Sequence, residues 1–579
     1  MIRWLPALAL VFVLAWIVHP LLLPHQVAGH SAYVDLSRSE AFHQAVRGGD
    51  LTPRWLPDFY YRYGSPIFNF YAPLTYYVIE TFRFIGLSGM WALKLTYLLF
   101  WLMASFYMWR LAGEVIDRDG AYAAAAAYLA APYLLIDAYV RVGIAEFAAF
   151  AWLPMILLGL WRSARETSAF GPLLAALAFA GLMLTHNITA MIATPLLLFF
   201  ALVVALDWKA ALKSLSSLLL GMTLAAFFWV PAIIEKKFVH ATESLTGGFF
   251  DFHHHFLAPK QLFVRFWGYG ASKPGLDDGM GFMYGELLWL AVLIAVPSCL
   301  LLRVRRETIN IRVRVAAFFA AAICLLMTLP VSKWLWESLP LIHFVQFPWR
   351  FLLPATAFGA LLVAALPMLV GERIRRLVVL ALVLLALGAS VQYLQVRYVY
   401  HDVKNNTFAF VMANQLKQVQ YEPDLVRPDH FLTIERIRQL GVTSTAAHDY
   451  LPFACTRPPE ALPANAVEAS GGNLEILSSS WGYPFVRAET QALIQEDVII
   501  NQFYFPGWQV TIDDAPGVIR VEPETGRMLV AVGPGRHALK VEFKDSPTRL
   551  LGKLISLFGM AIFGIWLWVA FVSRNYYAT

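Results

Sequence analysis

Long apolar runs separated by short polar loops dominate the chain, and their length gives the first prediction. A transmembrane helix needs about 20 mainly apolar residues, and about twelve runs approach that length. They are 4–23, 90–110, 119–137, 145–161, 169–186, 188–206, 214–233, 284–302, 315–331, 349–369, 377–393 and 550–572. The pattern predicts a polytopic α-helical membrane protein with about twelve spans, the first of them an uncleaved anchor.

The segment 71–87 is also apolar, but Pro73, Glu80 and Arg83 interrupt it. These residues favour an interfacial or re-entrant helix, and a full span stays open.

Basic residues gather in alternate loops between the runs. They are Arg110 and Arg118, Arg162 and Arg165, Lys209 and Lys213, five arginines within 303–314, three within 373–376, and Arg574. By the positive-inside rule these loops and both termini lie in the cytoplasm. The outside face then receives the loops 24–89, 234–283 and 332–348 and the region 394–548.

The outside region 394–548 is long enough to form a domain after the membrane domain 1–393. A helical stretch is expected near 406–440. Five segments then alternate as strands do: 473–477, 497–504, 508–512, 527–532 and 537–543. Turn sequences separate these strands, which predicts an α/β portion followed by an extracytoplasmic β-sandwich-like domain. The segment 549–579 supplies the final transmembrane helix and a cytoplasmic tail.

Composition excludes several classes of protein. Hydrophobic residues make up 59% of the chain and charged residues only 15%, so neither a soluble enzyme nor a disordered chain fits. The net charge of +6 arises from 45 Lys and Arg against 39 Asp and Glu. The basic residues lie in the short loops between apolar runs and form no basic stripe of the kind that binds nucleic acid. We therefore expect no nucleic-acid partner. The three cysteines show no disulfide or metal spacing.

The first outside loop carries candidate carboxylates. Asp35 is a candidate general base toward a hydroxyl, or a ligand for a divalent cation. Alternatively it caps a short helix predicted over 38–46, with Ser37 as the competing cap. Asp50 fits a turn. Asp58 is either an ion-pair partner of Arg54 or a second acidic site residue.

Charged and polar groups also mark the outer ends of later spans. Arg141 is a candidate phosphate ligand and Glu146 a candidate for orienting a substrate, or the two form an ion pair. His186 and Asn187 follow the fifth span as candidate substrate ligands, with helix capping as the alternative.

Glu235, Lys236 and Arg350 stand at further outer ends. The two basic residues either bind a lipid phosphate or simply reach the interface.

Metal and nucleotide chemistry have little support. The run Asp251, His253, His254 and His255 places consecutive side chains in different directions, so we expect no metal site there. The chain contains no HExxH, GxSxG or Walker A motif, and no GxGxxG in a strand–turn–helix context. We therefore expect no nucleotide cofactor, whereas a divalent metal stays open.

Several motifs resemble a known family. The stretch GGDLTPRWLPDFYYRYGSPIFNFYAPLTYY resembles the first loop of bacterial membrane proteins labelled "6-pyruvoyl-tetrahydropterin synthase-related". APYLLIDAYVRVGIAEF, LTHN, FFWVPAIIE, WGYG and VQFPWRF follow in the family's order. NQFYFPGWQVTIDD and GPGRHALKVEF resemble the tail of a related family that glycosylates cell-envelope polymers. Together these motifs cover most of the chain.

The resemblance implies a GT-C-type membrane glycosyltransferase of the bacterial inner membrane, not a pterin enzyme. Such enzymes use polyprenyl-phosphate-linked sugars on the outer side and need an acidic residue in the first outside loop. That role would fall on Asp35. The family pattern places an acid about one turn before a histidine, whereas His30 precedes Asp35 here, so Asp58 stays an alternative. Arg54, Arg141, Glu146, His186, Asn187 and Arg350 lie within matching motifs.

The expected partners are the lipid bilayer, a polyprenyl-phosphate-linked sugar donor, and an envelope glycan, lipid or protein acceptor. Direct displacement by the acceptor would invert the anomeric centre. Two other functions stay open. A lipid or polysaccharide transporter predicts charges near the bilayer midplane and inverted repeats. A non-enzymatic envelope assembly protein would use the 394–548 region to bind polysaccharide or a partner.

Overall fold

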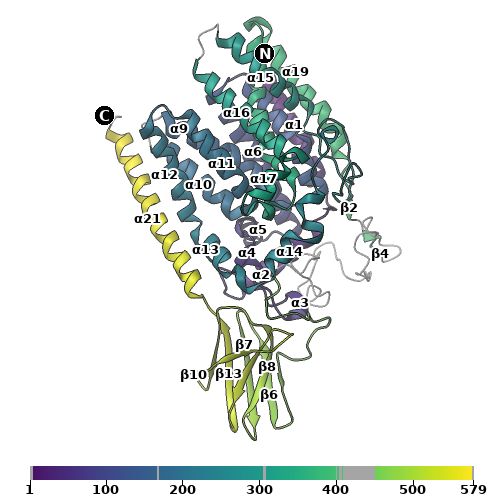
Figure 1. The fold of residues 1–579 in the computed structure, drawn as a ribbon, viewed down its shortest axis with the longest axis vertical. Helices are drawn as coiled ribbons and strands as arrows, with labels where there is room; N and C mark the ends of the chain where they lie inside the picture. The colour runs from purple at the N-terminus through teal and green to yellow at the C-terminus, as the bar shows by residue number, and fades with distance from the viewer. Residues whose placement is uncertain are drawn as a thin grey trace.

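The computed structural model describes residues 4–165, 169–303, 308–399, 401–402, 407–408 and 450–576. A helical bundle carries a β domain at one end, and helix α21 (Pro547–Tyr576) returns from that domain along the bundle (Figure 1). Both marked chain ends lie at the end of the bundle far from the β domain. This arrangement fits termini on one side and the β domain on the other; which side is outside stays a prediction.

Each predicted apolar run coincides with a helix or with a broken pair of helices. The bundle helices are α1 (Leu5–Leu22), α6 (Gly89–Val115), α7 (Gly120–Leu129), α8 (Pro132–Ile136), α9 (Ile144–Arg165), α10 (Phe170–Thr185), α11 (Asn187–Val204), α12 (Trp208–Leu224), α13 (Ala226–Ile234), α15 (Glu286–Arg303), α16 (Thr308–Met327), α18 (Leu352–Val363), α19 (Glu372–Ser390) and α21. Seven helices of the described chain are long and apolar enough to cross a membrane, or ten if each bent pair is one span. Two shorter apolar helices, Phe170–Thr185 and Glu286–Pro297, cover the remaining predicted runs. The chain is thus a membrane protein, and the number twelve stays a prediction.

The segment 71–87 forms α5 (Leu74–Phe84), a helix of 11 residues. At about 1.5 Å per residue it is roughly 16 Å long, about half of the ~30 Å hydrocarbon core. It packs against α2 (Ala32–Arg47) and α6, at the end of the bundle that faces the β domain (Figure 1). Helix α5 is therefore too short to span alone.

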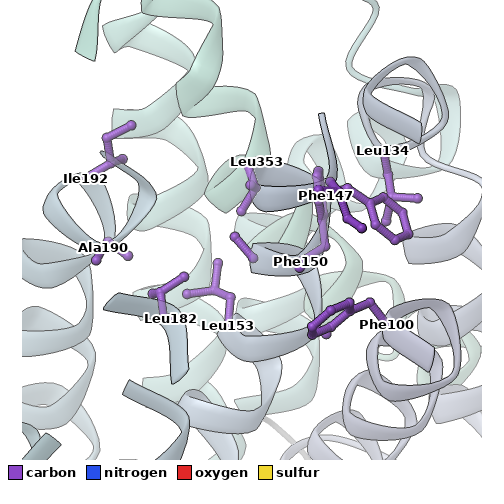
Figure 2. Packing of buried hydrophobic residues seen from close by; sticks show 14 of the residues in the cluster. Phe100, Leu134, Phe147, Phe150, Leu153, Leu182, Ala190, Ile192 and Leu353 are labelled. Atoms are coloured by element: carbon purple, nitrogen blue, oxygen red, sulfur yellow. The ribbon is translucent and has the colours of Figure 1, made fainter. Parts of the chain in front are cut away.

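Helix α9 forms the centre of the bundle, and 94% of the residues in its most apolar stretch are buried. Figure 2 shows its side chains packed among those of neighbouring helices: Phe147, Phe150 and Leu153 of α9 with Phe100 of α6, Leu182 of α10 and Leu353 of α18. At Gly159 a Cβ would collide with the backbone of Ala175 in α10. Small residues allow such close helix packing in lipid, and this packing buries whatever polar groups α9 carries.

The C-terminal domain consists of two antiparallel sheets. The strands are β5 (Val467–Ala469), β6 (Leu474–Trp481), β7 (Phe485–Ala492), β8 (Glu496–Phe503), β9 (Trp508–Ile512), β10 (Ala515–Pro516), β11 (Ile519–Val521), β12 (Arg527–Val532) and β13 (Gly535–Phe543). One sheet has the order β10-β9-β13-β7-β6 and the other β11-β12-β8-β5. All five predicted strands are present, and the antiparallel β domain is confirmed.

Strand β7 was not predicted, although its burial alternates along FVRAETQA. Two of its inward residues are alanines and one is a threonine, which weakens the apolar pattern. Most of the predicted helical stretch near 406–440 lies outside the described residues. Residues 407–408 form strand β4, which pairs with β3 (His401–Asp402).

The β domain holds a loop of the membrane domain in an uncommon backbone conformation. Tyr60, Tyr61 and Arg62 have φ values of 52°, 55° and 74°, a left-handed region that costs a non-glycine residue about 1–2 kcal/mol. Gln502 of β8 donates to the Arg62 carbonyl at 2.6 Å and the Pro57 carbonyl at 3.3 Å.

Further contacts fix the same loop. Gln502 accepts a hydrogen bond from Trp55 Nε1 at 2.7 Å, and the Phe503 N–H donates to the Tyr63 carbonyl at 2.7 Å. The Arg62 guanidinium lies 3.9 Å from the ring centre of Trp481. We call residues 60–62 the left-handed loop.

Candidate active site

A break between two helices brings the first long loop to the start of α9. The π-helix η1 (Asp137–Arg141) ends at Val142, whose φ of 52° is left-handed, and α9 begins two residues later. Residues of the first loop run alongside: the His30 N–H donates to the Val140 carbonyl at 3.0 Å, and the Ser31 N–H to the Arg141 carbonyl at 2.8 Å. A Cβ at Gly29 would overlap Val142 and the Val140 carbonyl, so this approach requires glycine.

Asp35 lies in the first turn of α2 and is 2% exposed. Its carboxylate accepts hydrogen bonds from the Tyr76 hydroxyl at 2.8 Å and from the Ile144 N–H at 3.3 Å, and Arg38 Nη1 lies 3.9 Å away. The Ile144 contact sets the carboxylate at the N-terminus of α9, where the helix dipole favours negative charge. Burial raises the pKa of Asp35, while Arg38, Tyr76 and Ile144 oppose the rise.

The predicted capping role of Asp35 is wrong. Helix α2 starts at Ala32 rather than at Arg38, so Asp35 and Ser37 lie inside it. The extra turn forms because the backbone at residues 30–31 is already fixed by the Val140 and Arg141 carbonyls.

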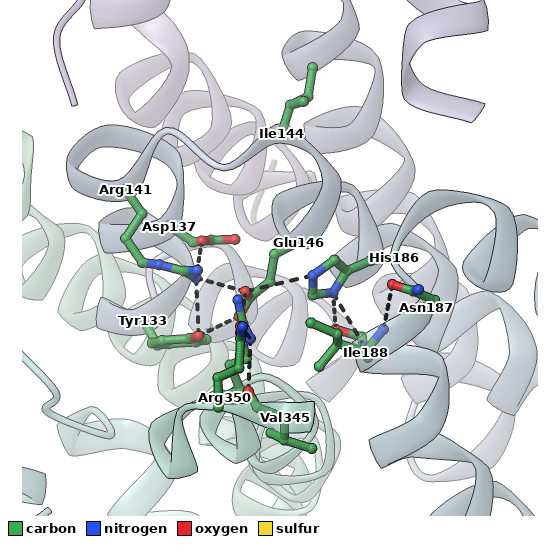
Figure 3. Close-up of polar contacts among 12 residues, drawn as sticks. Tyr133, Asp137, Arg141, Ile144, Glu146, His186, Asn187, Ile188, Val345 and Arg350 are labelled. Atoms are coloured by element: carbon green, nitrogen blue, oxygen red, sulfur yellow. Dashed lines mark hydrogen bonds and ion pairs between the residues drawn. The ribbon is translucent and has the colours of Figure 1, made fainter. Parts of the chain in front are cut away.

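Glu146 gathers side chains from four separate chain segments, and we call this group the Glu146 cluster: Tyr133, Asp137, Arg141, Glu146, His186 and Arg350 (Figure 3). The Tyr133 hydroxyl donates to Glu146 at 2.5 Å. Arg141 Nη1 and Arg350 Nε lie 2.9 and 3.1 Å from Glu146 Oε2. The predicted ion pair between Arg141 and Glu146 is present, and Arg350 joins it.

Each arginine keeps unused hydrogen-bonding capacity. Arg141 bonds Asp137 (2.5 Å), Tyr133 (3.3 Å) and Glu146 through Nη1 alone. Arg350 uses Nε for Glu146 and Nη1 for the Val345 carbonyl and Gln346 Oε1, at 2.7 and 2.8 Å. Among the described residues, Nη2 of neither arginine has a hydrogen-bond acceptor. A guanidinium has five N–H groups in a planar fork, so both can bind a further anion.

Two carboxylates balance the two arginines. Asp137 is fully buried, and its Oδ2 has no hydrogen-bond partner among the described residues. The cluster can therefore accept a hydrogen bond at Asp137 as well as donate several from its arginines. Such a combination suits a ligand that carries both hydroxyl and phosphate groups.

His186 and Asn187 differ in their relation to this cluster. His186 caps α11, since its Nδ1 accepts from the Thr189 N–H at 3.3 Å, and its Nε2 lies 4.0 Å from Glu146 Oε2. Asn187 is exposed, bonds the Ile188 N–H at 3.0 Å, and lies at the edge of the group in Figure 3. Both proposed roles of His186 thus remain compatible with its position.

Arg54 and Asp58 lie against other parts of the molecule. Arg54 donates to the Phe68 and Phe227 carbonyls at 3.2 and 2.5 Å, and burial lowers its pKa to about 10. Asp58 accepts a hydrogen bond from Tyr483 of the β domain. Asp50 is the expected turn residue, because it accepts from the Thr52 N–H at 3.0 Å.

Glu235 forms a second buried group, which we call the Glu235 clasp: Asn69, Glu235, Ser546, Thr548 and Arg549. Asn69 donates to Glu235 at 2.8 Å, and Arg549 Nη2 lies 3.0 Å from it. The hydroxyls of Ser546 and Thr548 donate to the other carboxylate oxygen. This clasp joins the first loop, the end of α13 and the start of α21.

Lys236 turns away from the clasp, and its Nζ lies 4.5 Å from the ring centre of Phe344. It lines a cavity of about 470 Å³. In the histidine run, His253 bonds Asp251 at 2.6 Å, and His255 bonds Ser272 at 2.9 Å. In the described part of the chain, no group of three or more His, Cys, Asp or Glu residues could hold a metal ion.

Sequence reasoning missed Tyr133, Asp137 and Tyr76, and it gave Gln346 no role although it noted this residue beside Arg350. One pattern pointed to the first two: Tyr133, Asp137 and Arg141 follow one another at four-residue spacing, which puts them on one helix face. The contacts of Gln346 with Arg350 and of Tyr76 with Asp35 arise from the folded structure, and no local pattern encodes them.

The chain matches a known family over more than half of its length. The family model described as the 6-pyruvoyl-tetrahydropterin synthase related domain, a membrane protein, matches residues 68–398, more than half of the chain. The chain belongs to this family. The synthase-related match contains the whole Glu146 cluster, whereas Asp35 precedes it.

Solved structures provide more distant similarities. The arabinofuranosyltransferase AftD from Mycobacteria has 16% identity and a TM-score of 0.42, over 68% of this chain and 26% of that chain. The Archaeoglobus fulgidus oligosaccharyltransferase, in complex with Zn and sulfate, has 14% identity and a TM-score of 0.39, over 66% of this chain and 52% of that chain. The chain thus spans about a quarter of the mycobacterial protein's length. No curated protein matches the chain.

Proposed function

We propose that this protein is a membrane glycosyltransferase that transfers a sugar from a polyprenyl-phosphate donor to a cell-envelope acceptor at the outer face of the membrane. One observation carries the proposal. A buried carboxylate, Asp35, bonds the N–H of Ile144, and two residues later Glu146 holds two arginines with unused N–H groups. A base and an anion site thus meet at the start of one helix.

Asp35 acts as the general base in this proposal. Its raised pKa brings the carboxylate closer to the range in which a base accepts a proton efficiently. Tyr76 and the Ile144 N–H fix its orientation. Asp58 stays the alternative base, although its contact with Tyr483 places it beside the β domain.

Arg141 and Arg350 bind the donor phosphate through their unused nitrogens. Guanidinium groups suit phosphate because their planar fork can bind two oxygens at once. Glu146 holds both guanidinium groups in place, and the N–H groups stabilise the charge that develops on the leaving phosphate.

The chemical step is a single displacement. The acceptor hydroxyl oxygen forms a bond to the anomeric carbon of the sugar, and its proton passes to Asp35. The bond from that carbon to the phosphate oxygen breaks, and the phosphate leaves with the electron pair. Because the nucleophile enters opposite the leaving group, the anomeric configuration is inverted. His186 and Asp137 contact the sugar hydroxyls, and Asp137 Oδ2 supplies an unused acceptor.

The test uses the full chain in nanodiscs with a panel of polyprenyl-phosphate sugars. Release of polyprenyl phosphate by the wild type, with an inverted product by NMR, supports the proposal, and Asp35→Asn should abolish it. Release by both proteins moves the base to Asp58 or Glu146. A third outcome is that the purified wild type releases no polyprenyl phosphate. If membrane extracts with added acceptor show no release either, the glycosyltransferase proposal is wrong and a transporter or assembly role takes its place.

A further inference from the structure

A cavity of about 470 Å³ opens beside the end of α13, away from the Glu146 cluster. Residues between 233 and 242 form most of its wall, and Phe453 closes it from the segment that leads into the β domain. Two hydrogen bonds tie these parts together: the Phe453 N–H donates to the Phe238 carbonyl at 2.8 Å, and the His240 N–H to the Leu451 carbonyl at 3.0 Å. The cavity therefore belongs to the folded junction and not to a free loop.

The charge in this cavity is positive. Lys236 and Lys237 both line it, and no carboxylate of the described residues forms an ion pair with either. The neighbouring Glu235 does not neutralise them, because its side chain is turned inward to Arg549. Aromatic rings position the two ammonium groups: Lys236 over Phe344 at 4.5 Å and Lys237 over Phe238 at 5.2 Å.

The rim of the cavity is apolar and exposed. Ile233, Ile234 and Phe453 are 65%, 41% and 62% exposed. Ile233 ends a predicted span, so the lysines follow at the level where a helix leaves the hydrocarbon. Basic pockets with apolar rims at this depth bind lipid headgroups. Two ammonium groups without a carboxylate select a headgroup with net negative charge, because a zwitterionic headgroup brings its own cation.

We propose that this cavity binds the headgroup of an anionic glycerophospholipid of the surrounding bilayer. The bound lipid is distinct from the sugar donor, because the segment 342–346 separates the two sites. Phe344 of that segment contacts Lys236, whereas Val345 and Gln346 bond Arg350. The cavity and the Glu146 cluster therefore contact different residues of this segment. Lipid binding in this cavity does not depend on the proposed glycosyl transfer.

The test measures lipid retention by native mass spectrometry. Full-length protein is released from nanodiscs of equal parts phosphatidylglycerol and phosphatidylcholine. The wild type should retain phosphatidylglycerol preferentially. Lys236→Ala/Lys237→Ala should reduce this preference by about 25-fold, since each basic residue near the membrane surface contributes about a factor of five. The matched control is Lys260→Ala/Lys273→Ala, which removes two exposed lysines of the same loop from outside the cavity.

A second variant guards against misfolding. Lys236→Arg/Lys237→Arg keeps the charge and should keep the preference, so its loss there would count against the proposal. Two further results would overturn it: equal retention of both lipids by the wild type, or an unchanged preference in the double alanine variant. Displacement of phosphatidylglycerol by an equimolar amount of polyprenyl phosphate would assign the cavity to the donor instead.

Discussion

Two buried glutamates, Glu146 and Glu235, each pair with arginine, yet their surroundings differ. Both oxygens of Glu235 are bonded. Arg549 Nη1 donates to the Lys544 carbonyl at 3.2 Å, and Nη2 donates to the Pro506 carbonyl at 2.7 Å as well as to Glu235. Around Glu146 the arginines keep unused nitrogens. The sequence marked both glutamates as site residues. A buried ion pair alone does not distinguish the two groups, whereas the spare donors make the Glu146 cluster the better candidate for a binding site.

The largest expected effect is the loss of transfer on changing Asp35. Asp35→Asn keeps the size of the side chain but removes the base, so the rate of polyprenyl phosphate release should fall by about 100- to 10,000-fold. Asp50→Asn is the matched control, because it changes a turn carboxylate of the same loop. An equal loss in both variants would show that the loop, and not the base, had been damaged.

Arg549→Ala should instead lower the stability of the fold. It leaves Glu235 buried without its cation, which costs about 3–5 kcal/mol in the free energy of unfolding. Arg350→Ala should mainly lower kcat/KM, because the proposed mechanism assigns Arg350 to the donor phosphate, while Glu146 keeps Arg141 as its ion-pair partner. Denaturant titration in nanodiscs measures the first effect and initial rates the second. A loss of kcat/KM without a loss of stability in Arg549→Ala, together with a loss of stability alone in Arg350→Ala, would contradict the distinction between the clasp and the cluster.

Gln502→Ala tests whether the β domain fixes the left-handed loop. It removes the partners of Trp55 Nε1 and of two carbonyls, at a cost of about 1–3 kcal/mol. We expect faster proteolytic cleavage near residues 60–62. Asn473→Ala, directly before β6 and at the end away from Trp481, is the control. Identical cleavage of all three proteins would contradict this role of Gln502.

The smallest expected effect is a shift of the pH profile. Asp35 must be deprotonated to act, so activity should rise with pH through its raised pKa and then level off. The Tyr76 hydrogen bond favours the carboxylate and lowers that pKa. Tyr76→Phe should therefore move the acid limb to higher pH while the plateau changes less. An unmoved limb would remove Asp35 as the titrating base.

Much of the architecture could be predicted because it repeats locally. Apolar length located the helices, and alternation located five strands. The remaining features could not be predicted, because they depend on contacts between residues far apart in the sequence. Helix capping stayed open as the alternative role of Asp35, because nothing local shows that residues 30–31 bond the broken turn at Val140 and Arg141. Arg549 was not considered at all, since its partner Glu235 is 314 positions away.

The left-handed loop has a consequence for how the protein is made. Residues 60–62 are synthesised long before Gln502 and Phe503, which stabilise their backbone. Before β8 is synthesised and its domain has folded, the contacts from Gln502 and Phe503 that stabilise the positive φ angles of this stretch are missing. A ribosome that stops early would therefore release a chain with most helices inserted but with an unfinished first loop. The fold thus makes completion of the chain a condition for completion of its opening segment.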